Sequence, residues 1–311
     1  MSSFRYPLRW RLMDALERAA DLLWPERLSR FTGWLMIAPA LLLVGLLVLG
    51  LVEMADGSLR TLDRATFLPS EELSLANYET ALGSATYWRV FGRSILGATL
   101  ATALTLALAF PYAYALVRVP GAVTRKALLV VLFLPFFIGQ VVRAYGWLII
   151  LGNGGMVNEA LGLVGIAPQR LLFNFSAVVF GLVQYLLPFA VLMLAPALTA
   201  IPAETETAAR SLGASWLRTI WHVVLPMARP GLIGAGLVTM TLALTDFATP
   251  AMLGGGSQDF IANAIYDQFF RTADQGLGSA LALMLVAAGS AIVALVLGLF
   301  GAGTLAMGAR R

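Results

Sequence analysis

Thr207-Ala-Ala-Arg-Ser-Leu-Gly213, followed by Val223-Val-Leu-Pro226, is the stretch that decides the fold of this chain. It lies in a polar segment between two long apolar segments. Ala208 and Ala209 have almost no side chain, so a helix that carries them can press closely into a groove. Gly213 can take the left-handed conformation that ends a helix. The stretch therefore predicts a short helix, a forced break and a second helix that leads back into a membrane.

The residues after the glycine support the second helix. Apolar side chains recur there at helical spacing, at Trp216, Ile220 and Val224. Pro226 and Pro230 set the angle of re-entry, because proline does not fit an ordinary helix interior. The alternative is an amphipathic connector between two spans, since Ala and Gly are common in membrane proteins.

The composition indicates a chain whose surface faces lipid. Apolar residues make up 59% of the 311 residues and charged residues only 12%, whereas a soluble domain carries about 25% charged residues. With no cysteine and one histidine, His222, the chain lacks the residues for disulfides, thiolate metal sites, a Cys nucleophile or a Ser-His triad. We expect an all-α membrane protein that binds no metal.

The basic residues exclude two further classes of function. Lys126 is the one lysine, and its context, Thr-Arg-Lys-Ala, is not the Gly-rich phosphate loop that ends in Gly-Lys-Ser/Thr. The chain is therefore expected to bind no cofactor and to hydrolyse no ATP itself. Its net charge of +4 does not indicate a nucleic-acid partner, because the arginines cluster at the ends of apolar segments.

Six apolar segments are long enough to cross a membrane, which takes roughly 20 residues. They cover about residues 33–52, 94–117, 127–151, 175–198, 230–253 and 277–306. Residues 1–30 are polar and Arg-rich with spaced apolar side chains, which predicts a cytoplasmic amphipathic helix on the membrane surface. The expected organisation is this N-terminal segment followed by a transmembrane domain over 31–311, with a cytoplasmic loop at about 199–229.

The distribution of positive charge predicts the orientation. Six spans put both termini on one side, and the segments on that side carry 14 Arg and Lys residues against six on the other. The positive-inside rule therefore places both termini and the 199–229 loop in the cytoplasm.

The Thr207–Gly213 stretch resembles the EAA loop of ABC-importer permeases, through which a membrane subunit contacts a separate ATPase. The family pattern is Glu-Ala-Ala, three residues, Gly, nine residues, then Ile-x-Leu-Pro. Val223 replaces the Ile, and Thr207 stands where the Glu is expected. Glu206 is one residue away, a rotation of about 100° around a helix, so coupling through an ion pair at position 207 is excluded.

Other stretches resemble the polyamine-type (spermidine/putrescine) branch of these permeases over roughly residues 33–300. They are Ala76-Asn-Tyr78, Leu134-Pro-Phe-Phe-Ile138, Arg143-Ala-Tyr-Gly-Trp147, Gly154-Gly-Met-Val-Asn158, Asp246-Phe-Ala-Thr-Pro250 and Leu253-Gly-Gly255. Permeases for ferric iron, thiosulfate, aminophosphonates and amino acids are similar, so another solute of this importer class is the alternative.

The resemblance implies a type I ABC-importer permease of the inner (cytoplasmic) membrane of a bacterial cell. Its implied partners are two ATPase subunits that hold ATP and Mg, a second permease subunit that is not identical, and an extracytoplasmic solute-binding protein. The residues implied in ATPase coupling are Glu204, Glu206, Thr207, Ala208, Ala209, Arg210, Leu212, Gly213, Leu225 and Pro226.

Two charged residues lie within the expected spans and are candidates for the solute pathway. A charge at the bilayer centre costs about 2.5–3.5 kcal/mol on insertion scales, so it normally faces a cavity or a partner. One hypothesis is that Asp246 contacts a cationic solute and that Arg143 shapes or gates the pathway. The alternative is that both lie near the outer interface as anchors, or pair with each other.

Two further features of the spans have two interpretations each. Pro135 and Gly139 break the third span, which either frees carbonyls to line a passage or only kinks the packing. Five aromatic residues either line an amine site or belong to the aromatic belts at the membrane surfaces: Tyr112, Tyr114, Tyr145, Trp147 and Tyr185.

Two other classes of protein fit the sequence less well. An ATP-independent secondary transporter would need charge relays along its spans and usually repeated halves, and this chain offers only Asp246 and Arg143. A membrane-embedded enzyme would need clustered His, Asp or Glu, which the sequence does not provide.

Overall fold

The computed structural model describes residue 10 and residues 13–14, 26–63, 65–66 and 68–301. The amphipathic helix expected over residues 1–30 lies almost wholly outside these residues. The chain divides into two units, residues 1–56 and 57–311. The first unit contains most of α2 (Glu26–Ser58), a 33-residue helix that includes Pro39. Its stretch from Gly33 to Ser58 is long and apolar enough to cross a membrane.

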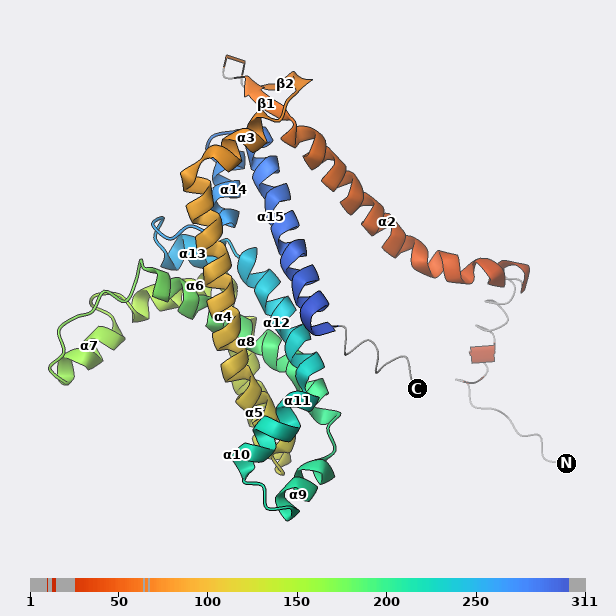
Figure 1. The fold of residues 1–311 in the computed structure, drawn as a ribbon, viewed down its shortest axis with the longest axis vertical. Helices are drawn as coiled ribbons and strands as arrows, with labels where there is room; N and C mark the ends of the chain where they lie inside the picture. Colours follow the sequence, from red (N-terminus) through yellow and green to blue (C-terminus); the bar gives the residue numbers. More distant parts are fainter. Residues whose placement is uncertain (1–9, 11–12, 15–25, 64, 67, 302–311) are drawn as a thin grey trace. The chain divides into compact units, whose positions relative to one another are not determined.

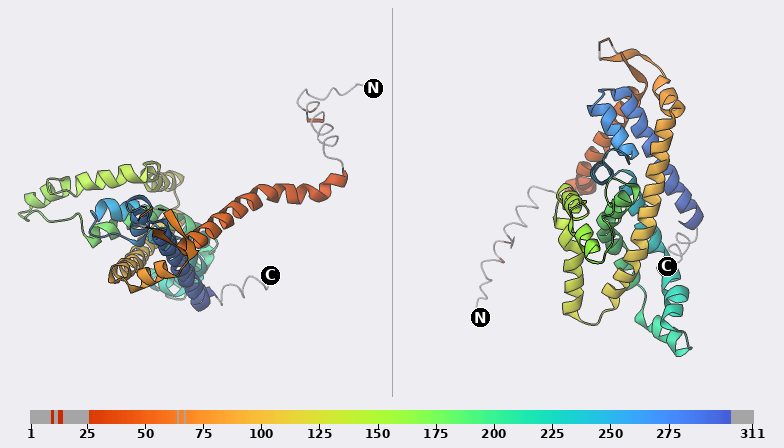
Figure 2. Two further views of the ribbon diagram at one scale, coloured as in Figure 1. Left: turned by 90° about the horizontal axis from the view of Figure 1, so that it is seen from above. Right: turned by 90° about the vertical axis from the view of Figure 1, so that its left-hand side faces the viewer.

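The second unit is a bundle built on three long helices (Figure 1). α4 (Ala85–Arg118), α8 (Phe175–Thr199) and α12 (Arg229–Leu244) pack against one another, and α15 (Gln275–Val296) packs against α12. Strands β1 (Arg60–Asp63) and β2 (Leu68–Leu73) form an antiparallel hairpin at one end. Helices α9 (Ala203–Ser211) and α10 (Trp216–Thr219) lie at the opposite end, as Figures 1 and 2 show.

Small side chains explain the close packing of these helices. The buried face of α4 carries Ala98, Ala101, Ala109 and Ala113, each with no exposed surface. Helices in lipid gain stability from van der Waals contact, which small residues make possible by letting backbones approach. Gly97 of α4 is a further example, because a Cβ there would collide with the ring of Phe260.

Two candidate spans are broken, as the prolines and glycines predict. The first consists of two segments that meet at an angle of 96°. One segment is α5 (Ala122–Phe133) with the 3-10 turn that follows it (Leu134–Phe137), and the other is α6 (Gln140–Ile150). The segment 216–227 and α12 form the second, bent by 71°. The described residues contain four helices long enough to span, or up to six if each bent pair is one span. The fold is therefore an all-α membrane protein, and the six-span count stays a prediction.

The polar segments contain more structure than the sequence indicated. Besides the hairpin, they form α3 (Ala76–Gly83), α7 (Met156–Leu163) and α14 (Ile261–Phe270). The fifth span, expected over 230–253, is interrupted instead: α12 ends at Leu244 and a separate helix, α13 (Ala248–Leu253), follows. The second span begins at Ala85 rather than near residue 94. The charge of Arg93 hid this earlier start. Its guanidinium donates to the carbonyls of Ser257 (2.9 Å) and Asp259 (2.6 Å), which lets it lie within the helix.

Candidate functional site

The loop between α8 and α12 forms a bent elbow of two short helices. Its first arm is α9 (Ala203–Ser211). The chain leaves this helix through Gly213, whose φ is +86°. The Gly213 N–H donates to the carbonyl of Arg210 (2.9 Å), and the Ala214 N–H donates to that of Ala209 (3.1 Å). These two bonds form a Schellman motif, the ordinary C-terminal cap built on a left-handed glycine. The predicted helix and forced break are therefore present.

The second arm of the elbow leads back to the bundle. α10 (Trp216–Thr219) starts at Ser215, whose Oγ accepts from the Arg218 N–H (3.4 Å). A π-helical turn (Ile220–Val224) and α11 (Leu225–Met227) follow. Pro226 stands directly after the π-helical turn, near the end of the helical run from Trp216 to Met227. This continuous path joins the elbow to α12.

The elbow presents an apolar surface outside the bundle. Leu212 is 90% exposed, and Trp216 and Leu217 are more than half exposed. Their neighbours in the sequence are mostly accessible as well: Glu204, Thr207, Ala208, Arg210 and Pro226 are exposed, whereas Ala209 and Leu225 are half-buried. A cluster of exposed large apolar side chains at a tight turn is typical of a surface that another protein covers.

Glu206 differs from the other coupling candidates because it is buried. Its side chain is only 6% exposed, and its carboxylate faces the end of α4. Arg118 Nε donates to Oε1 (2.8 Å), Arg118 Nη2 lies 2.7 Å from the same oxygen, and Tyr114 Oη donates to Oε2 (2.6 Å). Arg210 Nη2 lies farther away, at 3.9 Å. Glu206 therefore binds within its own chain in this structure.

The sequence reasoning did not connect Arg118 or Tyr114 with the elbow. Arg118 also donates through Nη2 to the carbonyl of Ile201 (2.9 Å), just before α9. The available signal was a Tyr and an Arg four residues apart at the end of a span, which places them on one helix face. Nothing in the sequence shows that their partner lies 92 and 88 residues away.

A second candidate site lies where α12 ends and α13 begins. Asp246 occupies this break and is 6% exposed. Its Oδ1 accepts from the Thr249 N–H (3.0 Å), and its Oδ2 accepts from Thr249 Oγ1 (2.9 Å) and Gln140 Nε2 (2.8 Å). An ionised carboxylate can accept about four hydrogen bonds. The backbone N–H of Ala248 is a further donor to this carboxylate, so the carboxylate is well supplied with partners from its own chain.

Arg143 lies near Asp246 but uses other partners. Its Nη1 donates to the Pro135 carbonyl across the helix break (3.2 Å), and its guanidinium lies 5.5 Å from the centre of the Tyr185 ring. Within the part of the chain that the structure describes, no ion pair joins Arg143 to Asp246. The geometry therefore does not support the alternative in which Arg143 and Asp246 pair with each other.

A cavity of about 310 Å³ opens beside Asp246. Asp246, Gln140 and Tyr185 contribute its polar lining. The rest of the lining comes from Leu242, Thr245, Phe247 and Ala248. A carboxylate, an amide and an aromatic ring around one cavity suit an organic ammonium group, which a carboxylate attracts by charge and a ring by its π-face.

The remaining aromatic candidates have different surroundings. Trp147 packs edge-to-face on Phe180 (4.6 Å between ring centres) and lies beside Arg143 and Tyr185. Tyr145 is 58% exposed on another face of α6, as a belt residue would be. Tyr112 donates to the Leu128 carbonyl (2.7 Å) and so joins α4 to α5.

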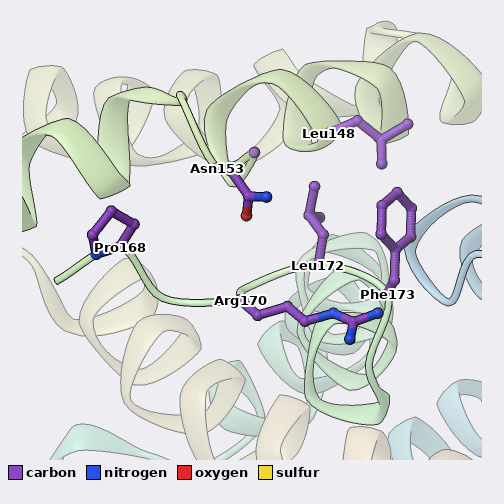
Figure 3. A pocket seen from close by; sticks show the side chains of 7 residues that line it. Leu148, Asn153, Pro168, Arg170, Leu172 and Phe173 are labelled. Carbon is purple, nitrogen blue, oxygen red and sulfur yellow. The ribbon is translucent and has the colours of Figure 1, made fainter.

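A larger cavity of about 750 Å³ lies beyond the end of α6. Figure 3 shows its lining from the end of α6 and from the loop before α8, with Asn153 and Arg170 as the polar side chains. Its one charged group is a guanidinium, which repels a cation. This cavity contains none of the residues predicted for the solute pathway.

Comparisons with known proteins agree with this geometry. Residues 107–305 match the family model described as "Binding-protein-dependent transport system inner membrane component". The spermidine/putrescine transport system permease protein PotB of Escherichia coli K12 is 34% identical over 81% of this chain and 89% of the relative. The inner membrane ABC transporter permease protein YdcU of the same organism is 30% identical over 67% of this chain and 70% of the relative.

A solved structure has the same fold. A bacterial ABC transporter involved in the import of the acidic polysaccharide alginate aligns with a TM-score of 0.73 at 18% identity, over 89% of this chain and 97% of that one. At this identity the likeness concerns the overall arrangement of helices alone.

Proposed function

The chain belongs to the family of binding-protein-dependent transport system inner membrane components, and from that premise we propose that it forms part of the pathway of a polyamine importer. It is a permease subunit of an ABC importer for a small solute, and it spans the inner membrane several times. It is not an enzyme, because ATP hydrolysis in such importers belongs to a separate chain. Spermidine, putrescine or a related amine is the favoured solute.

The observation that carries the assignment is the exposed elbow at 203–217. A Schellman cap fixes its bend, and Leu212, Trp216 and Leu217 are each more than half exposed. This surface suits the groove of an ATPase, because a rigid turn with apolar side chains loses little conformational entropy on docking. ATP-driven closure of two ATPase subunits would then swing α9 and tilt the helices attached to it.

The assembly we propose has four kinds of component. Six spans would place both termini and the elbow in the cytoplasm, in line with the charge distribution. A second, non-identical permease subunit would complete the pathway. Two ATPases would dock on the cytoplasmic loops, and a binding protein would deliver solute on the opposite face.

The cavity beside Asp246 is the proposed contact with the solute. An amine nitrogen in this cavity would lie beside the charged carboxylate of Asp246 and the amide of Gln140. Arg143 would shape this site from the break between α5 and α6. The binding protein would supply most of the selectivity. The contact with Asp246 would therefore position the solute in the pathway rather than determine which solute is carried.

The test is to identify the binding protein that co-purifies with this permease and its ATPase. Calorimetry of that protein would use putrescine, spermidine, an amino acid, thiosulfate and ferric iron. We expect tight binding of a polyamine, and ATPase activity in proteoliposomes that rises when the loaded binding protein is added. Binding of only an anion or an amino acid would assign another solute, and uptake without an ATPase would contradict the importer assignment.

A further inference from the structure

We propose that Glu206 and Arg118 form a latch that transmits the movement of α9 directly to α4. This inference rests on the proposed function, because it assumes that an ATPase moves the elbow. The chain itself joins α9 to α8 and, through α10 and α11, to α12. α4, in contrast, is not next to the elbow along the chain, because α5, α6, α7 and α8 lie between them. Any pull on α4 must therefore pass through side-chain contacts or through its packing within the bundle.

The contacts at the end of α4 meet this requirement. Arg118 is the last residue of α4, and its guanidinium binds both Glu206 on α9 and the Ile201 carbonyl just before α9. Tyr114, one turn earlier, donates to the other oxygen of the same carboxylate. Both carboxylate oxygens are thus held by one helix, which fixes the orientation of the carboxylate as well as its position.

α4 also touches the second arm of the elbow. The ring of Tyr114 packs edge-to-face against Trp216 at the start of α10, with 6.3 Å between ring centres. One tyrosine therefore contacts α9 through its hydroxyl and α10 through its ring. The end of α4 is joined to both sides of the bend that Gly213 creates.

Burial makes this latch stronger than a surface ion pair. The Glu206 side chain is 6% exposed and that of Arg118 is 21% exposed, so water and salt screen the pair less than they would at the surface. Removing one partner would leave a buried charge without compensation. Arg271 and Asp267 form an i,i+4 pair that is far more exposed, at 73% and 35%, and it cannot hold two elements together in this way.

The experiment compares Glu206→Gln with Asp267→Asn in the complete transporter in proteoliposomes. Both changes neutralise the carboxylate of an ion pair, but the pair of Asp267 and Arg271 is far more exposed and belongs to α14 rather than to the elbow. The readout is the number of solute molecules taken up per ATP hydrolysed, because a simple folding defect lowers both rates together. We expect Glu206→Gln to lower this ratio by roughly 5- to 10-fold, the range of a moderate coupling free energy, and Asp267→Asn to leave it unchanged.

A second variant shows whether the two residues act as a pair. Arg118→Met should reproduce the loss, and the double variant Glu206→Gln/Arg118→Met should be no worse than either single change, because residues in one network are not additive. Equal ratios for Glu206→Gln and Asp267→Asn would overturn the latch. Failure of the unaltered chain to bind any ATPase would instead overturn the proposed function.

A distance measurement tests the latch without relying on uptake. The natural chain has no cysteine, so spin labels at Ala203→Cys on α9 and Leu104→Cys on α4 report only this pair. Both positions are exposed. We expect one distance in the ATP-bound and nucleotide-free states of the complete transporter, and two distances when Glu206→Gln is added. A distance that changes with ATP in the unaltered background would show that α4 and α9 move independently.

Discussion

At the scale of single residues, Gly213 sets the shape of the elbow. Its φ of +86° costs about 1–2 kcal/mol for a residue with a Cβ. No atom of this chain lies within 4 Å of a Cβ built there, so a larger side chain would project outward toward a docked partner. We expect Gly213→Leu to abolish uptake and solute-stimulated ATPase activity while the protein still inserts into the membrane.

Gly213→Asn is the matched control, because asparagine adopts the left-handed conformation more readily than other residues with a Cβ. We expect it to keep most of the uptake. Ala209→Trp, on the half-buried face of α9, should behave like Gly213→Leu. Normal uptake in Gly213→Leu would count heavily against the elbow as a lever.

Asp246 offers a test of the solute contact. Asp246→Asn keeps an oxygen that can accept from the Thr249 N–H but removes the charge. Hydrogen bonds to charged groups contribute about 1.5–3 kcal/mol. We therefore expect the concentration for half-maximal amine uptake to rise by about 10- to 100-fold, measured with the loaded binding protein in excess.

Thr249→Val separates the charge from the local structure. It removes the hydroxyl that donates to Asp246 Oδ2 (2.9 Å) but leaves the carboxylate charged. Its effect on amine uptake should be smaller than that of Asp246→Asn. Equal effects from the two substitutions would make Asp246 a structural anchor, which is the alternative that the sequence left open.

The residue scale also shows where sequence reasoning stops. The pattern around Gly213 predicted the left-handed cap because one glycine determines a local conformation. The same pattern left open which group Glu206 binds. That partner, Arg118, is brought to it by the packing of α4 on α8, and no local signal encodes packing between distant segments.

At the scale of elements, the contact between α4 and α14 limits the size of one residue. A Cβ at Gly97 would collide with the ring of Phe260. We expect Gly97→Ala to destabilise the purified protein by about 1–3 kcal/mol, the usual cost of overpacking, and to lower its thermal unfolding temperature in detergent.

Gly92→Ala is the control on the same helix. Gly92 is exposed and has no atom within 4 Å of a built Cβ, so alanine should keep or raise stability through its higher helix propensity. Unfolding temperatures that are the same for Gly97→Ala and the natural chain would refute this account of the α4–α14 contact.

Hydropathy located the long helices but not the short ones. Long apolar runs identified α2, α4, α8 and α15, and Pro135 and Gly139 identified the break between α5 and α6. The hairpin and α14 depend on tertiary contacts instead. The N-terminus of α14, for example, is fixed by Ser94 Oγ of α4, which accepts from the Ile261 N–H (2.8 Å). Such distant caps leave no periodic signal in the sequence.

At the scale of the whole molecule, the orientation in the membrane can be tested directly. The chain has no cysteine, so single cysteines report one position each. Leu73 on β2 is 64% exposed and Val123 at the start of α5 is 81% exposed. We expect an impermeant maleimide to label Leu73→Cys on intact spheroplasts and Val123→Cys only after the membrane is opened. The reverse pattern would invert the proposed topology.

The central claim is that the elbow at 203–217 docks on a separate ATPase. A photo-crosslinking amino acid in place of Leu212, which is 90% exposed, tests it most directly in membranes that contain the complete transporter. The account predicts a covalent adduct with the ATPase from position 212 and none from position 73 on the hairpin. If position 212 yields no ATPase adduct while the transporter remains active, the elbow does not receive the power stroke and the account is contradicted.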